Sequence, residues 1–192
     1  MIIAACATNE AALLMKALKQ FKVEIPVMTT GGGFGDPTFF EAVGPGGTDG
    51  AVACQTYMYE AYRFSTQPEK YKEWITRTEE LTDFGWSEQT VHGWMPCGVT
   101  LAVLDEAETL DGQSILAALR SIDLPRDSLF NWYSLYEGCK FEQANGCYNQ
   151  NKYAICIYGQ IQNDAYVPVF IPGFEIPKDE NPLIWPTKAY RD

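Results

Sequence analysis

The sequence predicts an α/β fold built on a parallel sheet, and three features near its amino terminus carry this prediction. Two short apolar runs, Ile2–Cys6 and Ile25–Met28, have the composition of buried parallel strands. A polar turn and a helix-forming segment follow each run, and a third apolar run covers Ala51–Gln55. Strand and helix therefore alternate, which is the pattern of a parallel sheet with flanking helices.

The two helices between these strands are predicted from capping residues and apolar spacing. The first is expected over residues 9–21, with Thr8 or Asn9 as its cap. Its apolar stripe consists of residues three or four positions apart, namely Ala11, Leu14, Met15, Leu18 and Phe21. The second helix is expected to begin at the Asp36-Pro37 pair, a cap followed by proline, and to end at Gly44.

The rest of the chain reads as helices followed by strands. Helices are expected over Pro68–Leu81, over 87–109 with a kink at Pro96, and over 114–121 behind an Asp111 cap. The later part alternates apolar and polar residues over Tyr153–Ile161, which predicts a strand. Asn163-Asp164 predicts a hairpin turn, with the returning strand at Tyr166–Ile171.

Charge and hydropathy exclude several classes of protein. The formal net charge is −11, which argues against nucleic acid as a partner because phosphate binding needs a clustered excess of Lys and Arg. No apolar run approaches the ~20 residues of a membrane span. Met1 leads directly into a strand, so we expect no secretory signal in this chain.

Motifs for catalysis, metals and cofactors are not found in the sequence. The glycine-rich TTGGGFGD turn has neither the Gly-Lys-Ser/Thr ending of a phosphate loop nor the G-x-G-x-x-G spacing. One histidine, His92, and six cysteines without a CxxC pair offer no usual zinc set. We therefore expect no metal, no cofactor and no catalytic residue, with a hydrolase as a distant alternative because acidic pairs are plentiful. A disulfide between Cys139 and Cys147 is left open.

The candidate ligand site lies where the first strands end. In open α/β sheets, ligands bind in the crevice at the carboxyl ends of the strands. The turns at Thr8-Asn9 and at Thr29 to Asp36 occupy those positions. Three consecutive glycines let a ligand approach the backbone closely and expose several amides, although such a loop also forms wherever positive φ angles are needed.

The order of motifs resembles the second half of a known family. The segments TNEAALLMKALKQ, GGGFGDPTFFEAVG and DGAVACQTY are similar to type I periplasmic binding proteins, closest to the branched-chain amino acid-like substrate-binding proteins of ABC importers. Four further segments follow in the same order: HGWMPCGVTLAVLDEA, SILAALRSIDLP, YEGCKFEQANGCYNQN and GQIQNDAYVPVFI. The resemblance extends to about Pro172 and rests on the order, because each motif alone is weak.

The resemblance implies Rossmann-like parallel sheets with flanking helices in two partial lobes. Residues 1–57 would form part of the second lobe, 58–150 part of the mainly helical first lobe, and 151–192 a hairpin and tail that return to the second lobe. It also implies a non-enzymatic, periplasmic or extracytoplasmic solute-binding component that delivers its ligand to a membrane permease. The ligand would lie between the lobes, in contact with residues of the two turns, namely Thr8, Asn9, Thr30, Gly31, Gly32, Gly33 and Phe34.

Two departures from the family pattern leave alternatives open. Amino acid binders of this family hold the ligand's ammonium with an acid in the glycine-rich turn, but here the only acid is Asp36, assigned to a helix cap. An amino acid, an aromatic or other carboxylate and an uncharged small molecule therefore all stay open. The family's amino-terminal half has no counterpart, so a homo-oligomer, a separate missing half and a fragment that binds nothing are alternatives. A ligand-sensing receptor or regulator of the same fold is another, because fold does not fix function.

Overall fold

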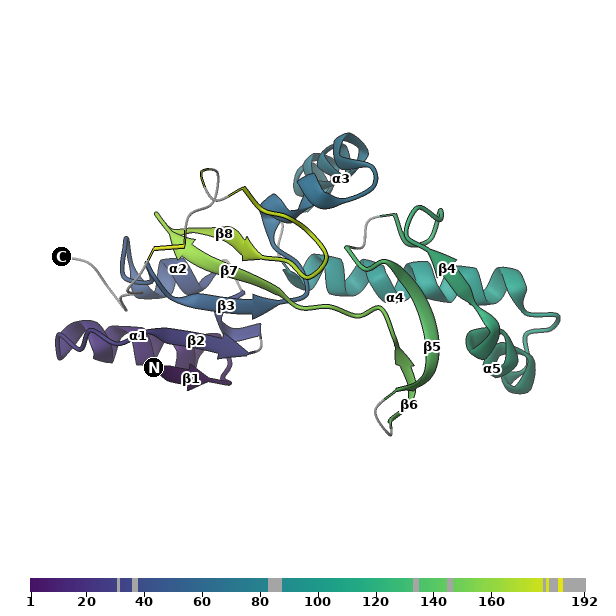
Figure 1. The fold of residues 1–192 in the computed structure, drawn as a ribbon, viewed down its shortest axis with the longest axis horizontal. Helices are drawn as coiled ribbons and strands as arrows, with labels where there is room; N and C mark the ends of the chain where they lie inside the picture. The colour runs from purple at the N-terminus through teal and green to yellow at the C-terminus, as the bar shows by residue number, and fades with distance from the viewer. Residues whose placement is uncertain are drawn as a thin grey trace. The chain divides into compact units, whose positions relative to one another are not determined.

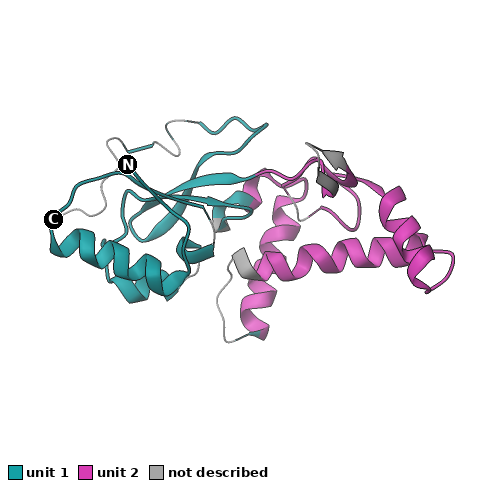
Figure 2. Cartoon of the chain, turned by 90° about the horizontal axis from the view of Figure 1, so that it is seen from below, with its two compact units in different colours: residues 1–61, 82–89, 156–192 teal, residues 62–81, 90–155 magenta. Residues whose placement is uncertain are grey.

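The computed structural model describes residues 1–30, 32–35, 38–82, 88–132, 135–144, 147–177, 179 and 183–184. The chain forms two compact units, coloured separately in Figure 2. The first comprises residues 1–61, 82–89 and 156–192, and the second comprises residues 62–81 and 90–155. The backbone therefore passes from one unit to the other several times.

A five-stranded sheet in the order β1-β2-β3-β7-β8 forms the centre of the first unit (Figure 1). β1, β2 and β3 are parallel, whereas β7 runs antiparallel to β3 and β8 antiparallel to β7. The α/β fold with a parallel sheet is thus confirmed, and the ends of β1, β2 and β3 lie within two residues of the predicted runs. The strands are β1 Ile2–Ala4, β2 Val27–Thr30, β3 Val52–Gln55, β7 Ile157–Gln162 and β8 Ala165–Phe170.

Helices α1 (Thr8–Gln20) and α2 (Thr38–Val43) connect the parallel strands and contact each other. The buried residues of α1 are Ala11, Ala12, Met15 and Leu18. Phe21 was expected in this stripe, but its side chain is 72% exposed. That expectation is wrong because the helix ends at Gln20 and the backbone turns at Lys22, whose φ is +52°, so Phe21 leaves the helical periodicity.

Hydrogen bonds connect the turn of the β7–β8 hairpin to the loop that precedes β3. Asn163 and Asp164 have φ values of +54° and +56°, which confirms the predicted tight turn. The carboxylate oxygens of Asp164 accept hydrogen bonds from the Gly46 N–H at 3.0 and 3.1 Å. In return, the Asp164 N–H donates to Oδ1 of Asp49 at 3.2 Å. These bonds join segments that are far apart in the sequence.

We expect Asp164→Ala to lower the free energy of unfolding by about 1.5–3 kcal/mol, the usual range for a hydrogen bond to a charged group. Asp164→Asn keeps an acceptor and a side chain that tolerates the left-handed backbone, so it should cost clearly less. Urea unfolding followed by circular dichroism measures both variants. If the alanine and asparagine variants lose equal stability, the contribution of Asp164 comes from the charge of its carboxylate and not from its tolerance of the left-handed backbone.

Gln160 of β7 holds a residue of the carboxyl-terminal tail. Its side chain is fully buried, and its Nε2 donates to the carbonyl oxygens of Gly50 at 3.3 Å and Ile184 at 3.1 Å. Its Oε1 accepts from the Ile184 N–H at 2.8 Å. The side-chain amide therefore bonds both backbone groups of Ile184, as a neighbouring strand would.

The second unit combines helices with a three-stranded antiparallel sheet, β4-β5-β6. Its helices begin and end close to the predicted positions, and the Asp111 cap is confirmed by bonds from the N–H groups of Gln113 and Ser114. The elements are η2 Tyr59–Phe64, α3 Pro68–Leu81, α4 Glu88–Glu106, α5 Gly112–Ser121, β4 Asp123–Pro125, β5 Gly138–Ala144 and β6 Cys147–Asn151. Pro96 lies inside α4, as expected.

The predicted strand at Tyr153–Ile161 is only partly correct. The ladder of β7 begins at Ile157, while residues 152–156 connect β6 to β7. Exposure still alternates along 151–156, although residues 152 and 153 form a turn closed by the bond from the Ala154 N–H to the Asn151 carbonyl oxygen at 3.2 Å. The alternation of apolar and polar residues was therefore read as one strand, where the chain instead turns before the ladder of β7 begins.

Cys139 lies in β5, opposite Leu124, and carries a free thiol that is 3% exposed. Burial raises the pKa of this thiol from 9.0 to about 11, because the thiolate is desolvated there. The side chain of Cys147, the other half of the disulfide left open by the sequence, lies outside the described side chains.

Stability should fall as the pH rises from about 9 to about 11. Below this window both states keep the proton of Cys139, whereas within it the unfolded chain loses the proton that the folded chain retains. The expected slope from this one group is at most about 1.4 kcal/mol per pH unit. Urea unfolding between pH 8 and 10.5 should show a shallower pH slope for Cys139→Ala than for the parent chain. Cys97→Ala, at an exposed free cysteine, should leave the slope unchanged.

Candidate functional site at the carboxyl ends of the parallel strands

The carboxyl ends of β1, β2 and β3 lie at one edge of the sheet (Figure 1). Ala4 pairs with Thr29, and Thr30 pairs with Cys54, so the three strands end side by side. The segments that follow them are residues 5–9, 31–35 and 56–58. This arrangement brings the two turns predicted from the sequence to the same edge.

The first two turns touch each other at Gly33. A Cβ atom placed on Gly33 would lie 2.2 Å from the carbonyl oxygen of Cys6 and 2.8 Å from the carbonyl carbon of Ala7. Such distances are far inside van der Waals contact, so only glycine fits at this position. Gly33 therefore sets the distance between the turn after β2 and the turn that leads into Thr8.

The predicted site residues divide into exposed and buried groups. Asn9, Thr30 and Gly32 are exposed and Thr8 is half-buried, so a ligand can reach them. Gly33 and Phe34 are buried, and the ring centroid of Phe34 lies 4.6 Å from that of Phe39. Phe34 thus packs in the core of the first unit. The remaining predicted residue, Gly31, lies outside the described residues, as does the predicted cap pair Asp36-Pro37.

Thr8 and Asn9 occupy the first turn of α1 and do not cap it. Ala7 stands at the cap position with extended backbone, and no side chain caps the helix there. The expectation of a Thr8 or Asn9 cap is wrong because the helix begins one residue earlier than the apolar pattern indicated. Glu10 also lies in this first turn, where a carboxylate is favourable because the amino end of a helix carries partial positive charge.

Glu10 is a polar residue of this edge that the sequence analysis did not select, whereas Thr29 begins the turn that it did select, Thr29 to Asp36. Glu10 is exposed and close enough to Cys6 to influence its thiol, so a carboxylate lies near the point where the two turns meet. The Thr29 side chain is fully buried, and its hydroxyl has no hydrogen-bond partner among the described residues. The alternation along β2 indicates that the Thr29 side chain is buried, because Thr29 lies on the same face of the strand as the buried Val27.

The third strand contributes a further polar residue. Gln55 ends β3 and is 3% exposed. The sequence indicates a polar site at this strand end, because two polar residues, Gln55 and Thr56, stand where the apolar run of the strand ends. Polar side chains at this edge are therefore not confined to the first two turns.

The chemistry of the edge suits binding. Burial, with a smaller effect of the Glu10 charge, raises the pKa of the Cys6 thiol, so that thiol stays protonated near neutral pH and is a weak nucleophile. Within the described part of the chain, no group of three or more His, Cys, Asp or Glu side chains is placed to hold a metal ion. The described helices also include none long and apolar enough to cross a membrane.

Comparison with known proteins finds similarity in structure only. No protein-family model and no curated protein matches the sequence. The leucine binding protein LivK of Thermotoga maritima matches with a TM-score of 0.65 and 17% identity, over 87% of this chain and 43% of that one. A branched chain amino acid ABC transporter protein of Thermus thermophilus with bound valine matches with a TM-score of 0.62 and 12% identity, over 91% and 46%. Rp1789 of Rhodopseudomonas palustris matches with a TM-score of 0.56 and 14% identity, over 88% and 48%.

These matches establish the fold. It is the type I periplasmic binding protein fold, as the resemblance of the motifs indicated. The chain spans less than half of the length of each of these structures.

Proposed function

We propose that the chain binds a small solute, an amino acid or a related small carboxylate, at the carboxyl edge of β1–β3. The observation that carries this proposal is the contact at Gly33, which joins the two turns and leaves Asn9, Thr30 and Gly32 exposed beside it. The names of two structural neighbours support the ligand class, since one is a leucine binding protein and the other holds valine. Both are named for binding or transport, which favours a role without catalysis.

The only acid of the glycine-rich turn, Asp36, is assigned to a helix cap from the sequence, and in this proposal Glu10 instead supplies the negative charge that holds an ammonium group. The ammonium group of an amino acid needs a carboxylate partner when it is taken out of water. Glu10 approaches this edge from the first turn of α1, close to Cys6. We propose Glu10 as the partner of the ammonium group and the turn amides as donors to the ligand's carboxylate.

In this proposal the chain forms the two partial lobes of a binding protein, with residues 1–57 and 151–192 in the second lobe and 58–150 in the first. The protein would act outside the cytoplasm and deliver its ligand to the permease of an ABC importer. The support is the shared fold and the transporter named among its structural neighbours.

Titration of the labelled protein with leucine, valine and benzoate, followed by two-dimensional amide NMR, tests the proposal. Leucine or valine should shift the amide signals of Thr8, Asn9, Thr30 and Gly32 in a saturable manner. Glu10→Gln should weaken amino acid binding by about tenfold or more, because a hydrogen bond to a charged group is worth about 1.5–3 kcal/mol. Glu24→Gln, at an exposed carboxylate elsewhere in the first unit, is the matched control. Shifts confined to other residues, or none with any of the three compounds, would contradict the proposal.

A second candidate, assembly with another polypeptide, is favoured by the open edge of β1. Among the described strands β1 pairs only with β2, so its other backbone edge is open. Ile3 of this strand is 63% exposed. An open edge with exposed apolar side chains is a site for pairing with another strand. We propose that a second copy or a separate amino-terminal half covers it, and light scattering that shows only monomer at high concentration would contradict the second-copy form.

A further inference from the structure

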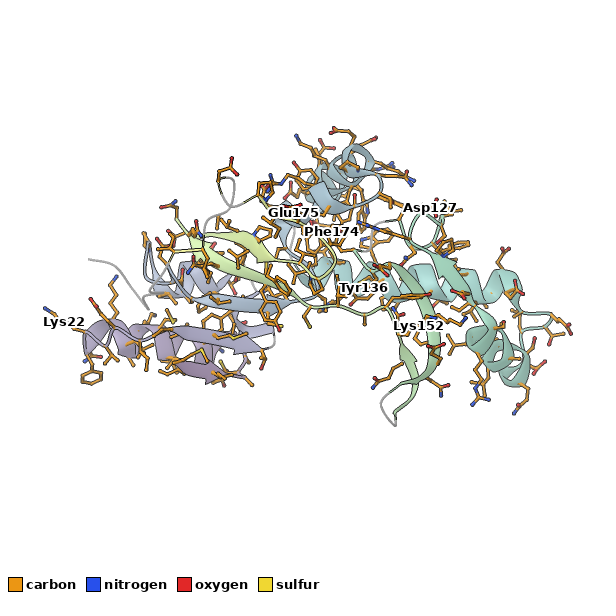
Figure 3. The ribbon with its side chains drawn as sticks, in the orientation of Figure 1. Lys22, Asp127, Tyr136, Lys152, Phe174 and Glu175 are labelled. Carbon is orange, nitrogen blue, oxygen red and sulfur yellow. The ribbon has the colours of Figure 1, made fainter. Side chains whose placement is uncertain are left out.

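The second unit contains a cavity of about 410 Å³ that is separate from the edge of β1–β3. One wall is α4, at Met95, Pro96 and Val99, and the opposite wall is β5, at Cys139 and Phe141. The segment that precedes β5 closes one side. Figure 3 marks this segment at Tyr136, which also lines the cavity.

The position of the cavity follows from the local sequence. Pro96 lacks an N–H group, so α4 cannot make its regular backbone bond at that residue. Val99 and Phe141 pack on a small core formed by Val103, Ala118 and Ile122, so the deeper end of the cavity is fixed by buried side chains. The wall is therefore a stable part of the second unit.

Among the described residues, no Asp, Glu, Lys, Arg or His side chain lines the cavity. The Cys139 thiol is also neutral at physiological pH, because burial raises its pKa to about 11. A charged ligand would lose its hydration there without gaining a partner of opposite charge, which is costly. The occupant that fits is uncharged.

The polar side chains of the lining include two hydroxyls, Thr100 and Tyr136, and two amides, Asn131 and Asn151. The Thr100 hydroxyl already donates to the Pro96 carbonyl oxygen at 2.7 Å. Asn151 Oδ1 accepts from the N–H groups of Lys140 and Tyr153, both at 3.2 Å. Asn131 is 5% exposed, and its Nδ2 makes a long hydrogen bond to the Pro125 carbonyl oxygen at 3.5 Å. Asn131 is therefore the wall residue best able to bond a ligand.

We propose that this cavity is a second binding site, for an uncharged and mostly apolar ring compound that donates one hydrogen bond to Asn131. Its volume lies in the ~300–1,000 Å³ range of small-molecule pockets, and apolar cavities of about 150 Å³ already hold benzene. The site is independent of the proposed amino acid site, because every residue that lines it belongs to the second unit.

Indole and indene form a matched pair of probes, since they share shape and differ in the N–H donor. Indole should bind saturably and about tenfold more tightly than indene, a ratio that corresponds to one net hydrogen bond. Asn131→Leu should bring the two affinities together. Benzoate and benzylamine, which carry opposite charges, should not compete with indole. Calorimetry measures the affinities, and amide NMR of the parent chain locates the binding.

Val99→Phe tests the location by filling the cavity, and it should weaken indole binding at least tenfold. Leu101→Phe is the matched control on the same helix, at a side chain that is 57% exposed, and it should leave binding unchanged. Amide shifts in the parent chain should fall at residues 95–100, 131 and 139–141, a readout that does not require any variant to fold. Shifts elsewhere, equal effects of the two phenylalanine variants, or no binding of indole would overturn the proposal.

Discussion

Replacing Gly33 with alanine is expected to destabilise the first unit by about 3 kcal/mol or more, at the upper end of the usual cost of overpacking. The new Cβ atom would lie 2.2 Å from the Cys6 carbonyl oxygen, and its other close neighbours are the backbone carbon and oxygen of Ala7. Backbone atoms cannot rotate away as the end of a side chain does, so the two turns must separate. Urea unfolding followed by circular dichroism measures the loss.

Gly93→Ala is the matched control for this substitution. A Cβ atom on Gly93 meets nothing within 4 Å, and the residue lies inside α4. Alanine should therefore stabilise that helix by roughly 0.5–1 kcal/mol. A loss of stability for Gly93→Ala equal to that for Gly33→Ala would mean that the contact with Cys6 is not the cause.

Truncation of Phe34 to alanine is expected to cost about 3–5 kcal/mol, the usual range for a buried phenylalanine. Its side chain is fully buried and its ring lies against Phe39. Phe34→Leu fills most of the same volume and should cost clearly less. Urea unfolding again gives the two values, and hydrogen exchange of the first unit shows whether the loss is local.

Phe21→Ala gives the comparison for an exposed ring in the same unit. This side chain is 72% exposed, so its loss should change stability by no more than about 0.5 kcal/mol. If Phe34→Ala proved equally mild and instead weakened ligand binding, Phe34 would be a ligand contact, as the family resemblance implied, and its placement in the core would be wrong.

The fold was predictable because its signals are local. Apolar runs, a helix cap at Asp111 and a turn at Asn163-Asp164 each depend on a few neighbouring residues. The predictions are wrong where one local sequence pattern is compatible with two local structures. The residues before Ile157 alternate apolar and polar side chains as a strand does, although the chain turns there, and Phe21 continues an apolar spacing after the helix has ended.

The sequence predicted where the site lies, at the carboxyl ends of the strands, but it did not predict how the residues there contact one another. The sequence places two turns at the same edge, but it does not show that Gly33 contacts Cys6 or that Glu10 lies nearby. Both facts depend on the packing of segments that are separate in the sequence. The cavity beside Pro96 escaped prediction for the same reason, because its walls come from α4, β5 and the segment between β4 and β5.

The bonds between Gln160 and Ile184 connect Ile184 to strand β7 of the sheet. Cleavage of the chain before Ile184 would weaken the hold on this residue, while the fully buried Gln160 amide would keep its bonds to Gly50 and Gln162. The Ile184 amide should exchange its hydrogen at a rate close to that of β7, and a protease should cut beside Ile184 only when the sheet itself opens.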